Sequence, residues 1–335
     1  MGAFNRIIIS RTDSIGDVIL TLPVAGILKK KFPDCEIIFM GREYTEAVIK
    51  ACEHIDAFLD WDKLSGGNEK DAVKTLKEIR ADLILHVFPR PEIARMAKKA
   101  GIPDRLGTTN RLYHWNTCNK LVRLSRRKSE LHEAQLNLKL IESISNEGLT
   151  SQKDIPDLYG LTNTEPVNDQ FLSLIDPSLK NIILHPKSKG SAREWGLENF
   201  ISLINILPKE NFRIFVSGTR EEGELIKASD LFEIDHVIDL TDQMTLGQLM
   251  SFIKQCDSLV AASTGPLHLA SALGIQAIGI YPPIKPMHPG RWAPLGKKAK
   301  YLVKQEDCED CRKQGPCHCM EEIRPEDVKK ILIDN

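Results

Sequence analysis

The sequence predicts an α/β protein of two domains, each built on a parallel β-sheet. The chain has 335 residues, about twice the usual length of a single domain. Short β-branched apolar runs alternate with helical patterns in both halves, which is typical of parallel strands joined by crossover helices. Residues 148–180 are rich in Asp, Asn, Pro, Ser and Thr, so we expect the interdomain linker there. The predicted domains are residues 1–165 and 166–335.

The first half begins with a strand, a loop and a helix. The isoleucines at 7–9 suit a buried parallel strand, Gly16 permits a tight turn, and apolar residues from Val18 onward follow a helical spacing to Lys31. Further strands are expected at residues 36–40, 57–60, 82–87 and, at the sheet edge, 102–107. Further helices are expected at residues 45–51, 69–80, 93–100 and 129–147.

The second half opens in the same way, which makes it a second Rossmann-like start. A strand at 181–184 runs into the loop 185–195 and then into a helix that begins near Leu197. Further strands are expected at residues 212–216, 237–240 and 258–262. Further helices are expected around Glu221 and Glu222, at 245–255, and after the loop 263–268.

Charge and hydropathy limit the classes of partner. The 45 basic and 46 acidic residues give a formal net charge of −1, which argues against a protein that holds nucleic acid by bulk electrostatics. The N-terminus lacks the pattern of a signal peptide, and no apolar run approaches the ~20 residues that span a bilayer. We therefore expect a soluble, cytoplasmic protein without a transmembrane segment.

Asp17 is the first candidate for chemistry. It lies where the first loop meets the first helix, and ligands of open α/β sheets bind beyond the carboxyl ends of the strands. A carboxylate there would face the binding crevice. The alternative is that Asp17 serves only as a helix cap.

Two loops of the second half suit a phosphate group. The loop 185–195 contains two lysines, an arginine, serines and a glycine between a strand and a helix, and the loop 263–268 places Thr264 and Gly265 before a helix with Pro266 in its first turn. A Walker loop and a Gly-x-Gly-x-x-Gly fingerprint are both absent, so a kinase or a nicotinamide dehydrogenase is not expected. Read alone, the strand, Thr-Gly and helix also fit simple packing.

Residues 105–128 are basic, and aromatic residues are interleaved among them. This stretch is either a site for an anionic acceptor or a solvated face. The positive residues are Arg105, Arg111, Lys120, Arg123, Arg126, Arg127 and Lys128.

The eight cysteines form two groups. Four are scattered and are expected to be reduced structural thiols: Cys35, Cys52, Cys118 and Cys256. The other four lie within residues 308–319: Cys308, Cys311, Cys317 and Cys319. The Cys-x-x-Cys pair is a common half of a zinc site, whereas Cys-x-Cys is a less usual second half. Residues 308–319 therefore hold either a structural zinc ion or free thiols.

Three motifs together resemble one family. They are Arg-x-Asp-x-Ile-Gly-Asp at 11–17 with Thr-Leu-Pro at 21–23, His-Pro-x-Ser-Lys-Gly-Ser-Ala-Arg-x-Trp at 185–195, and Ser-Thr-Gly-Pro-x-His-Leu-Ala-x-Ala-Leu-Gly at 263–274. In this order and spacing they resemble the ADP-heptose:lipopolysaccharide heptosyltransferases of glycosyltransferase family 9. The resemblance covers nearly the whole chain. It implies a GT-B architecture of two facing Rossmann-like domains, the N-terminal one for the acceptor and the C-terminal one for the nucleotide sugar.

The resemblance also implies roles for residues. Asp17 corresponds to the catalytic carboxylate, which would take the proton of the acceptor hydroxyl while that oxygen attacks the anomeric carbon from the opposite face, with inversion. The expected donor-binding residues are Lys187, Ser188, Arg193, Glu222, Met244, Ser263, Thr264, Gly265 and His268. The expected acceptor-binding residues are Asp13, Arg123, Arg126 and Arg127. The expected partners are ADP-heptose and a lipid-linked core oligosaccharide at the inner face of the inner membrane, and no cofactor is required.

One residue departs from the family pattern. Ser263 stands where the family usually has the Asp of Asp-Thr-Gly, and a hydroxyl supplies no charge. The identity of the transferred sugar is therefore open. One alternative is a transferase of the same fold that uses another nucleotide sugar or acceptor. The other is a catalytically silent protein that binds a sugar nucleotide or a glycolipid.

Overall fold

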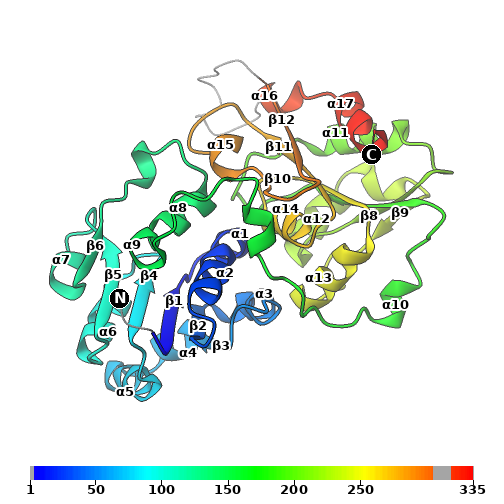
Figure 1. Ribbon diagram of the computed structural model, residues 1–335. Helices are drawn as coiled ribbons and strands as arrows, with labels where there is room; N and C mark the ends of the chain where they lie inside the picture. Colours follow the sequence, from blue (N-terminus) through cyan, green and yellow to red (C-terminus); the bar gives the residue numbers. More distant parts are fainter. Residues whose placement is uncertain (1–3, 305–317, 335) are drawn as a thin grey trace. The chain divides into compact units, whose positions relative to one another are not determined.

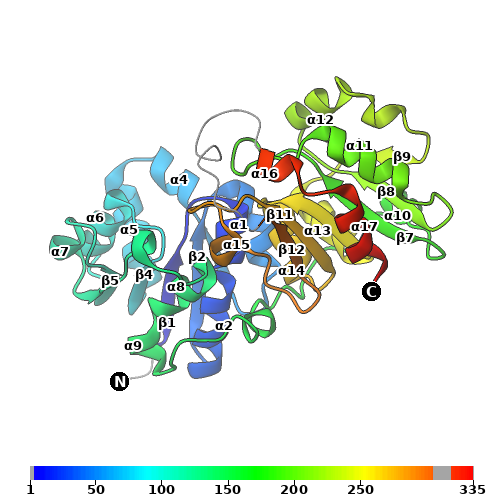
Figure 2. The same ribbon diagram turned by 90° about the horizontal axis from the view of Figure 1, so that it is seen from above.

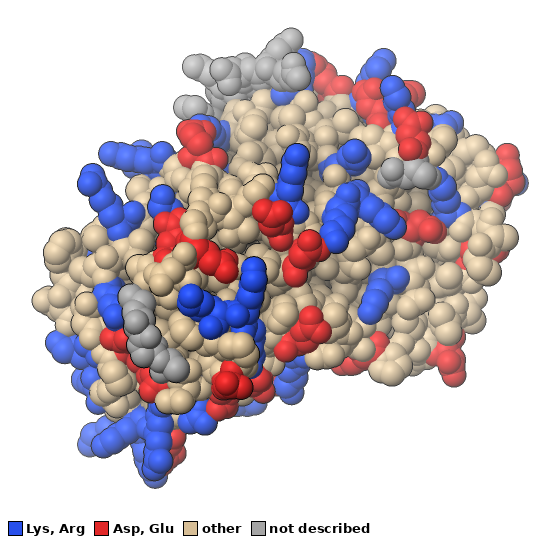
Figure 3. Space-filling model, in the orientation of Figure 1, with Lys and Arg blue, Asp and Glu red and all other residues tan. Residues whose placement is uncertain are grey.

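The computed structural model describes residues 4–304 and 318–334, and the chain divides into two compact units, Met1–Asn163 and Thr164–Asn335. Each unit has a six-stranded sheet in which every pair of neighbours is parallel (Figure 1). No helix among the described residues is long and apolar enough to cross a bilayer. On the face drawn in Figure 3, Lys and Arg are interspersed with Asp and Glu.

The sheet of unit 1 has the order β3-β2-β1-β4-β5-β6, the arrangement of a Rossmann fold. Its strands are β1 Arg6–Ser10, β2 Glu36–Gly41, β3 Ala57–Asp60, β4 Leu83–His86, β5 Asp104–Thr108 and β6 Lys120–Val122. The apolar residues of β1 are fully buried because the strand has neighbours on both sides and layers above and below. The carboxyl ends of all six strands lie at one edge, where the ligand loops are expected.

The helices of unit 1 begin at polar caps that the sequence supplies. Ser14 caps the first helix, Asp60 accepts two backbone hydrogen bonds at the fourth, and Asn68 caps the fifth. The described helices are α1 Ile15–Ile19, α2 Leu22–Lys31, η1 Glu43–Thr45, α3 Glu46–Lys50, α4 Trp61–Gly66, α5 Glu69–Ile79, α6 Pro91–Lys99, α7 His114–Thr117, η2 Arg126–Lys128, α8 Glu133–Lys139, α9 Glu142–Ser145 and η3 Ile155–Leu158.

The sheet of unit 2 repeats this order as β12-β11-β10-β7-β8-β9 (Figure 2). Its strands are β7 Lys180–His185, β8 Phe212–Val216, β9 Val237–Asp239, β10 Ser258–Ala262, β11 Gln276–Tyr281 and β12 Lys300–Val303. Its described helices are α10 Asp169–Leu172, α11 Leu197–Ile206, α12 Arg220–Lys227, η4 Asp230–Glu233, α13 Leu246–Gln255, α14 Gly265–Ala272, α15 Pro289–Trp292, α16 His318–Glu321 and α17 Pro325–Ile333. The fully buried Trp195 anchors the core, and its Nε1 donates to the carbonyl of Ile323 at 2.8 Å.

Three expectations about the elements were wrong. The segment 102–107 is no edge, because β6 pairs beyond β5. The helix expected at 129–147 is two helices, α8 and α9, and the first helix is likewise interrupted between Ile19 and Leu22. The division between the units, after Asn163, falls inside the segment 148–180 where the linker was expected. Within that segment, η3 packs against α2 so closely that a Cβ on Gly26 would lie 2.6 Å from the Leu158 carbonyl oxygen.

Candidate active site

Asp17 lies in the first turn of α1, at the carboxyl edge of the unit 1 sheet. Ser14 is the N-cap, and its Oγ accepts from the Asp17 backbone N–H at 3.4 Å while donating to Oδ2 of Asp17 at 2.6 Å. The other carboxylate oxygen, Oδ1, accepts a hydrogen bond from Nη2 of Arg11. Each oxygen of the carboxylate is therefore held by its own partner, one buried and one exposed.

Arg11 is buried, although its guanidinium is charged. Its side chain is only 4% exposed, and it pairs with Oδ1 of Asp13 at 2.7 Å, with Asp17, and with Oε1 of Glu133 at 3.3 Å. The planar fork of arginine allows several carboxylates to be served at once. Asn137 connects this cluster to the junction of α1 and α2. Its Oδ1 accepts from Nη1 of Arg11 at 3.4 Å, and its Nδ2 donates to the carbonyl of Leu20 at 3.0 Å.

The charges of this cluster shift the pKa values of two members. Burial raises the pKa of Asp13 to about 6, since the opposing effect of Arg11 is partly cancelled by the negative charge of Asp17. Burial by itself lowers the pKa of Arg11, but the carboxylates of Asp17, Asp13 and Glu133 more than offset it and keep the guanidinium charged. The cluster is thus a pair of aspartates organised by one permanent cation.

The structure separates the three arginines that were expected to bind an acceptor. Arg126 is half-buried, and it pairs with Oε1 of Glu133 at 2.9 Å and donates to Oδ1 of Asn137 at 2.9 Å. It belongs to the interior network that holds Arg11. Arg123 and Arg127 are exposed.

Arg90 is a further residue of this edge that the sequence analysis did not single out. It follows β4, and its guanidinium donates to Oγ1 of Thr12 at 2.6 Å and to the Thr12 carbonyl at 3.1 Å. Its Cζ lies 5.2 Å from the centre of the Phe88 ring. β1 and β4 are adjacent and their connections leave in opposite directions, so Arg90 and Asp17 lie at the topological switch point of the sheet.

In unit 2, helix α14 begins at the carboxyl edge of the sheet, directly after β10. Thr264 is its N-cap but makes no side-chain capping bond, and its buried Oγ1 has no hydrogen-bond partner among the described residues. The ring of His268 is also buried, its Nδ1 has no described partner, and burial lowers its pKa to about 4. Unsatisfied polar atoms of this kind at a helix N-terminus are suited to an anionic ligand.

Ser263 is occupied by the fold. Its side chain hydrogen-bonds with the Tyr281 hydroxyl, which also bonds to the carbonyl of Trp292. The hydroxyl of Ser263 thus links the end of β10 to the end of β11.

The basic loop after β7 contains an internal anion. The carboxylate of Glu194 pairs with Nζ of Lys187, and its Oε1 accepts from the Ser188 N–H at 3.0 Å and from the Ser188 hydroxyl at 3.1 Å. Ser188 is 5% exposed, and Arg193 is half-buried on the same loop. Glu194 therefore takes up donors that the sequence analysis assigned to a ligand.

Glu222 lies in the first turn of α12 and is 5% exposed. Its Oε2 accepts from the Thr219 N–H at 2.8 Å and completes a capping box. His185, at the end of β7, lies near it and contacts the Ser217 hydroxyl at 3.0 Å through Nδ1. Burial lowers the pKa of His185 despite the negative charge of Glu222. Met244 is half-buried just before α13.

The cysteines add no described metal site. Cys35, Cys52, Cys118 and Cys256 are buried free thiols, and Cys319 is also buried. Cys308, Cys311 and Cys317 lie outside the described residues, and the described part of the chain contains no group of three or more potential metal ligands.

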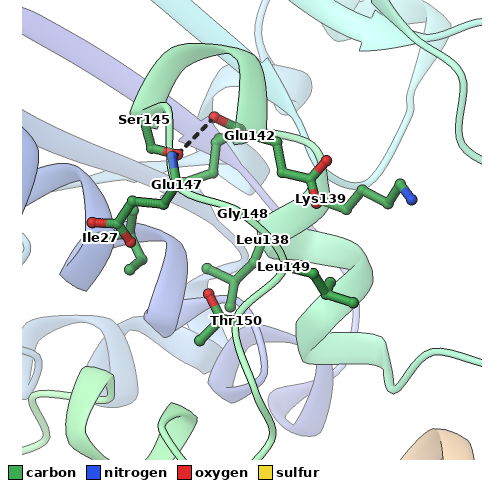
Figure 4. Close-up of a pocket in the computed structure, with 10 residues that line it drawn as sticks. Ile27, Leu138, Lys139, Glu142, Ser145, Glu147, Gly148, Leu149 and Thr150 are labelled. Atoms are coloured by element: carbon green, nitrogen blue, oxygen red, sulfur yellow. Dashed lines mark hydrogen bonds between the residues drawn. The ribbon is translucent and has the colours of Figure 1, made fainter.

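A small pocket in unit 1 lies apart from these residues. Ile27 of α2, Leu138 and Lys139 of α8, and the segment 147–150 contribute to its lining (Figure 4). None of the predicted site residues lines it, so it has no part in the candidate site.

Comparison with known proteins agrees with the fold and the motifs. The family model of glycosyltransferase family 9 (heptosyltransferase) matches residues 72–320. A Haemophilus influenzae protein named "Putative glycosyltransferase" is 27% identical over 307 residues, which are 89% of this chain and 88% of that protein. The lipopolysaccharide core heptosyltransferase OpsX of the same organism is 21% identical, over 82% of this chain and 78% of its own. The structure of E. coli ADP-heptose lps heptosyltransferase II superimposes with a TM-score of 0.75 at 18% identity, covering 98% of this chain and 97% of its own, so the fold is that of the GT-B heptosyltransferases.

Proposed function

We infer the function from the family: the chain belongs to glycosyltransferase family 9, the heptosyltransferases, and is thus a glycosyltransferase. We propose that it moves a heptose from ADP-heptose to the inner core of lipopolysaccharide with inversion at the anomeric carbon. The observation that supports this most is the Asp17 carboxylate, which Arg11 and Ser14 hold at the switch point of unit 1. A fixed carboxylate there is suited to act as a general base.

In the proposed reaction, Asp17 accepts the proton of the acceptor hydroxyl. The acceptor oxygen forms a bond to the anomeric carbon of the heptose as the bond from that carbon to the ADP oxygen breaks on the opposite face, so the configuration inverts. The proton remains on Asp17, and ADP departs with the electron pair. Because Arg11 occupies Oδ1 and the exposed Ser14 hydroxyl occupies Oδ2, the acceptor hydroxyl takes the place of Ser14 at Oδ2.

The donor is proposed to bind unit 2. Its diphosphate would use Thr264 Oγ1, which has no hydrogen-bond partner in the described part of the chain, and the backbone N–H groups in the first turn of α14, with Arg193 and Lys187 supplying positive charge to the departing ADP. Glu222 is proposed to bind the ribose, and Met244 and His268 to line the nucleotide and sugar site. The acceptor is proposed to be a lipid-linked core oligosaccharide at the inner face of the inner membrane, bound by Asp13, Arg123 and Arg127 of unit 1.

Asp17→Asn tests the base. We expect donor affinity, measured by calorimetry with ADP, to stay within about twofold, because the donor site is in the other unit. Turnover should fall by ~10²-fold or more, as is typical when a general base is removed. Asp62→Asn, which removes a half-buried carboxylate that pairs with Arg42 in the same unit, is the matched control. An Asp17→Asn variant that turns over at the parent rate would exclude Asp17 as the base.

Ser263 favours a second candidate within the same reaction class. The hydroxyl interacts with Tyr281, and Ser263 replaces the carboxylate that the resemblance to the family leads us to expect there, so we propose as the second candidate a donor other than ADP-heptose. A panel of ADP-, GDP- and UDP-sugars, assayed for nucleotide release with the acceptor, separates the two candidates. Turnover with ADP-heptose alone supports the first, and turnover with another sugar supports the second.

A further inference from the structure

The connection between β5 and β6 exposes two large apolar side chains. Leu112 is 87% exposed and Trp115 is 60% exposed, and Leu112 is the most exposed large apolar residue in the described part of the chain. Both belong to the turn and short helix at residues 109–117. Figures 1 and 2 place α7 at the outer end of the unit 1 sheet, beside β5 and α6.

The fold holds these two side chains outward. The indole Nε1 of Trp115 donates to the Thr109 carbonyl at 3.1 Å, and the Thr109 N–H donates to the carbonyl of Val122 at 3.0 Å. The single polar atom of the indole is thus satisfied inside the loop, and the exposed part of the ring is purely apolar. The neighbouring His114 is buried and contacts the backbone of Thr108, which fixes the helix to the sheet.

Positive charge surrounds this apolar tip. Residues 105–128 contain seven Lys and Arg and no Asp or Glu. Three of the seven are engaged internally: Arg105 with backbone carbonyls, Lys120 with Asp104, and Arg126 with Glu133. Arg111 and Arg123 are exposed and adjoin the tip. Arg111 directly precedes Leu112, and Arg123 directly follows Val122, whose carbonyl accepts from the Thr109 N–H.

Acidic groups near the tip are few. Burial raises the pKa of the Tyr113 hydroxyl, the positive charge of Arg111 opposes this, and the negative charge of Glu92 of α6 adds to it. Lys98 of α6 donates to the carbonyl of Asn116 at 2.7 Å and adds a further positive charge. In Figure 3, the left margin, where Figure 1 has α7, is mostly uncharged surface with Lys and Arg beside it.

We propose that this α7 surface, formed by Arg111, Leu112, Trp115 and Arg123, docks the protein on an anionic lipid bilayer. Tryptophan with a satisfied N–H and a neighbouring leucine insert into the interfacial region of a membrane, and basic residues at the rim add about 1 kcal/mol each near an anionic surface. One apolar contact combined with a basic rim gives reversible, peripheral binding.

A second copy of the chain is a poorer occupant for this surface. A twofold contact would set the same patch against itself, and its arginines would then face one another without acidic partners. A bilayer of anionic lipids supplies both the apolar layer and the opposite charge.

The docking surface also suits the acceptor. Thr109 and Arg123 lie at the carboxyl edge of β5 and β6, and the parallel sheet places Asp17 at that same edge. The identity of the lipid-linked acceptor rests on the proposed function. Bilayer binding itself is measured without any substrate, so the two can fail separately.

The test uses vesicles of phosphatidylcholine with and without phosphatidylglycerol. The whole chain is sedimented with each vesicle at several salt concentrations. We expect binding only to the anionic vesicles, weakened by salt, and roughly tenfold or more weaker for the double variant Leu112→Ser/Trp115→Ser. Leu225→Ser, at an exposed leucine of unit 2, is the matched control and should bind like the parent. Arg111→Ser should flatten the salt dependence.

Fluorescence locates the contact. Of the four tryptophans, Trp61 and Trp195 are buried, so a vesicle-induced blue shift that Trp115→Phe removes assigns insertion to the α7 surface. Turnover then separates docking from the chemistry: the double variant should lose more activity with a vesicle-embedded acceptor than with a water-soluble one. Three results would overturn the proposal: a parent protein that does not bind anionic vesicles, a double variant that binds them like the parent, or an equal loss of activity with both acceptors.

Discussion

Replacing Arg11 by methionine removes the guanidinium that pairs with both Asp13 and Asp17. The side chain is 4% exposed and pairs with three carboxylates that are each at most 20% exposed: Asp13, Asp17 and Glu133. Breaking a buried pair from one side leaves the other charge uncompensated and costs about 3–5 kcal/mol. We expect Arg11→Met to lower the free energy of unfolding of unit 1 by that amount. Urea unfolding, with hydrogen exchange of β1 and β4 to isolate the unit, measures the loss.

The matched control and a second variant test the electrostatic origin. Arg95→Met, at an exposed arginine that pairs with Glu69, should cost at most ~1 kcal/mol. Adding Asp13→Asn to Arg11→Met should restore roughly 1–2 kcal/mol, because one uncompensated carboxylate disappears. If Arg11→Met were no more damaging than Arg95→Met, or if the two substitutions in the double variant were additive, the buried ion cluster would not support the fold as argued.

Two further predictions concern other charged or ionisable groups. His86 is fully buried, neither ring nitrogen has a described hydrogen-bond partner, and burial next to His114 and Arg105 lowers its pKa from 6.5 to about 3. The unfolded chain therefore takes up this proton first as pH falls, so the stability that depends on neutral His86 is full above pH ~6.5 and declines toward pH ~3. His86→Phe should reduce the loss of unfolding free energy between pH ~7 and ~5 by roughly 2 kcal/mol. An unchanged loss would contradict this prediction. Glu194→Gln should tighten ADP binding roughly threefold to tenfold in calorimetry, because the diphosphate no longer competes with a carboxylate for Lys187, whereas weaker binding would mean that Glu194 organises the loop.

Much of the fold could be predicted because its signals are local. The β-branched run of β1, the cap before α1 and the proline in the first turn of α14 are each written in a few adjacent residues. The last third was less completely predicted, although Gln276–Tyr281 is an apolar run typical of a buried strand, and Pro325, Val328 and Leu332 have the spacing of an amphipathic helix.

The surroundings of Asp17 could not be predicted in the same way. The pattern indicated a carboxylate at a helix start, with a helix cap as the alternative, and hence a loss of only ~1 kcal/mol on substitution. Its main partner, Arg11, is held by Glu133 and Asn137, which are 122 and 126 residues away in sequence. The packing of α8 against α2 brings these groups beside Arg11, which directly follows β1, and no local sequence pattern encodes that contact. The same holds for Arg126, whose charge suggested a ligand site and whose burial gives it an internal partner.

The two units show how one strand order can serve opposite electrostatic tasks. In both, the first and fourth strands are neighbours and their loops meet at the carboxyl edge of the sheet. In unit 1, the buried Arg11 holds the carboxylates of Asp13 and Asp17 at that edge, which makes the edge suited to accept a proton. In unit 2, Thr264 Oγ1 at the start of α14 has no hydrogen-bond partner among the described residues, which makes that edge suited to an anion. A glycosyl transfer needs a base for the acceptor and a stabilised anion for the leaving nucleotide, and in the proposed function Asp17 of unit 1 supplies the first and the start of α14 in unit 2 supplies the second.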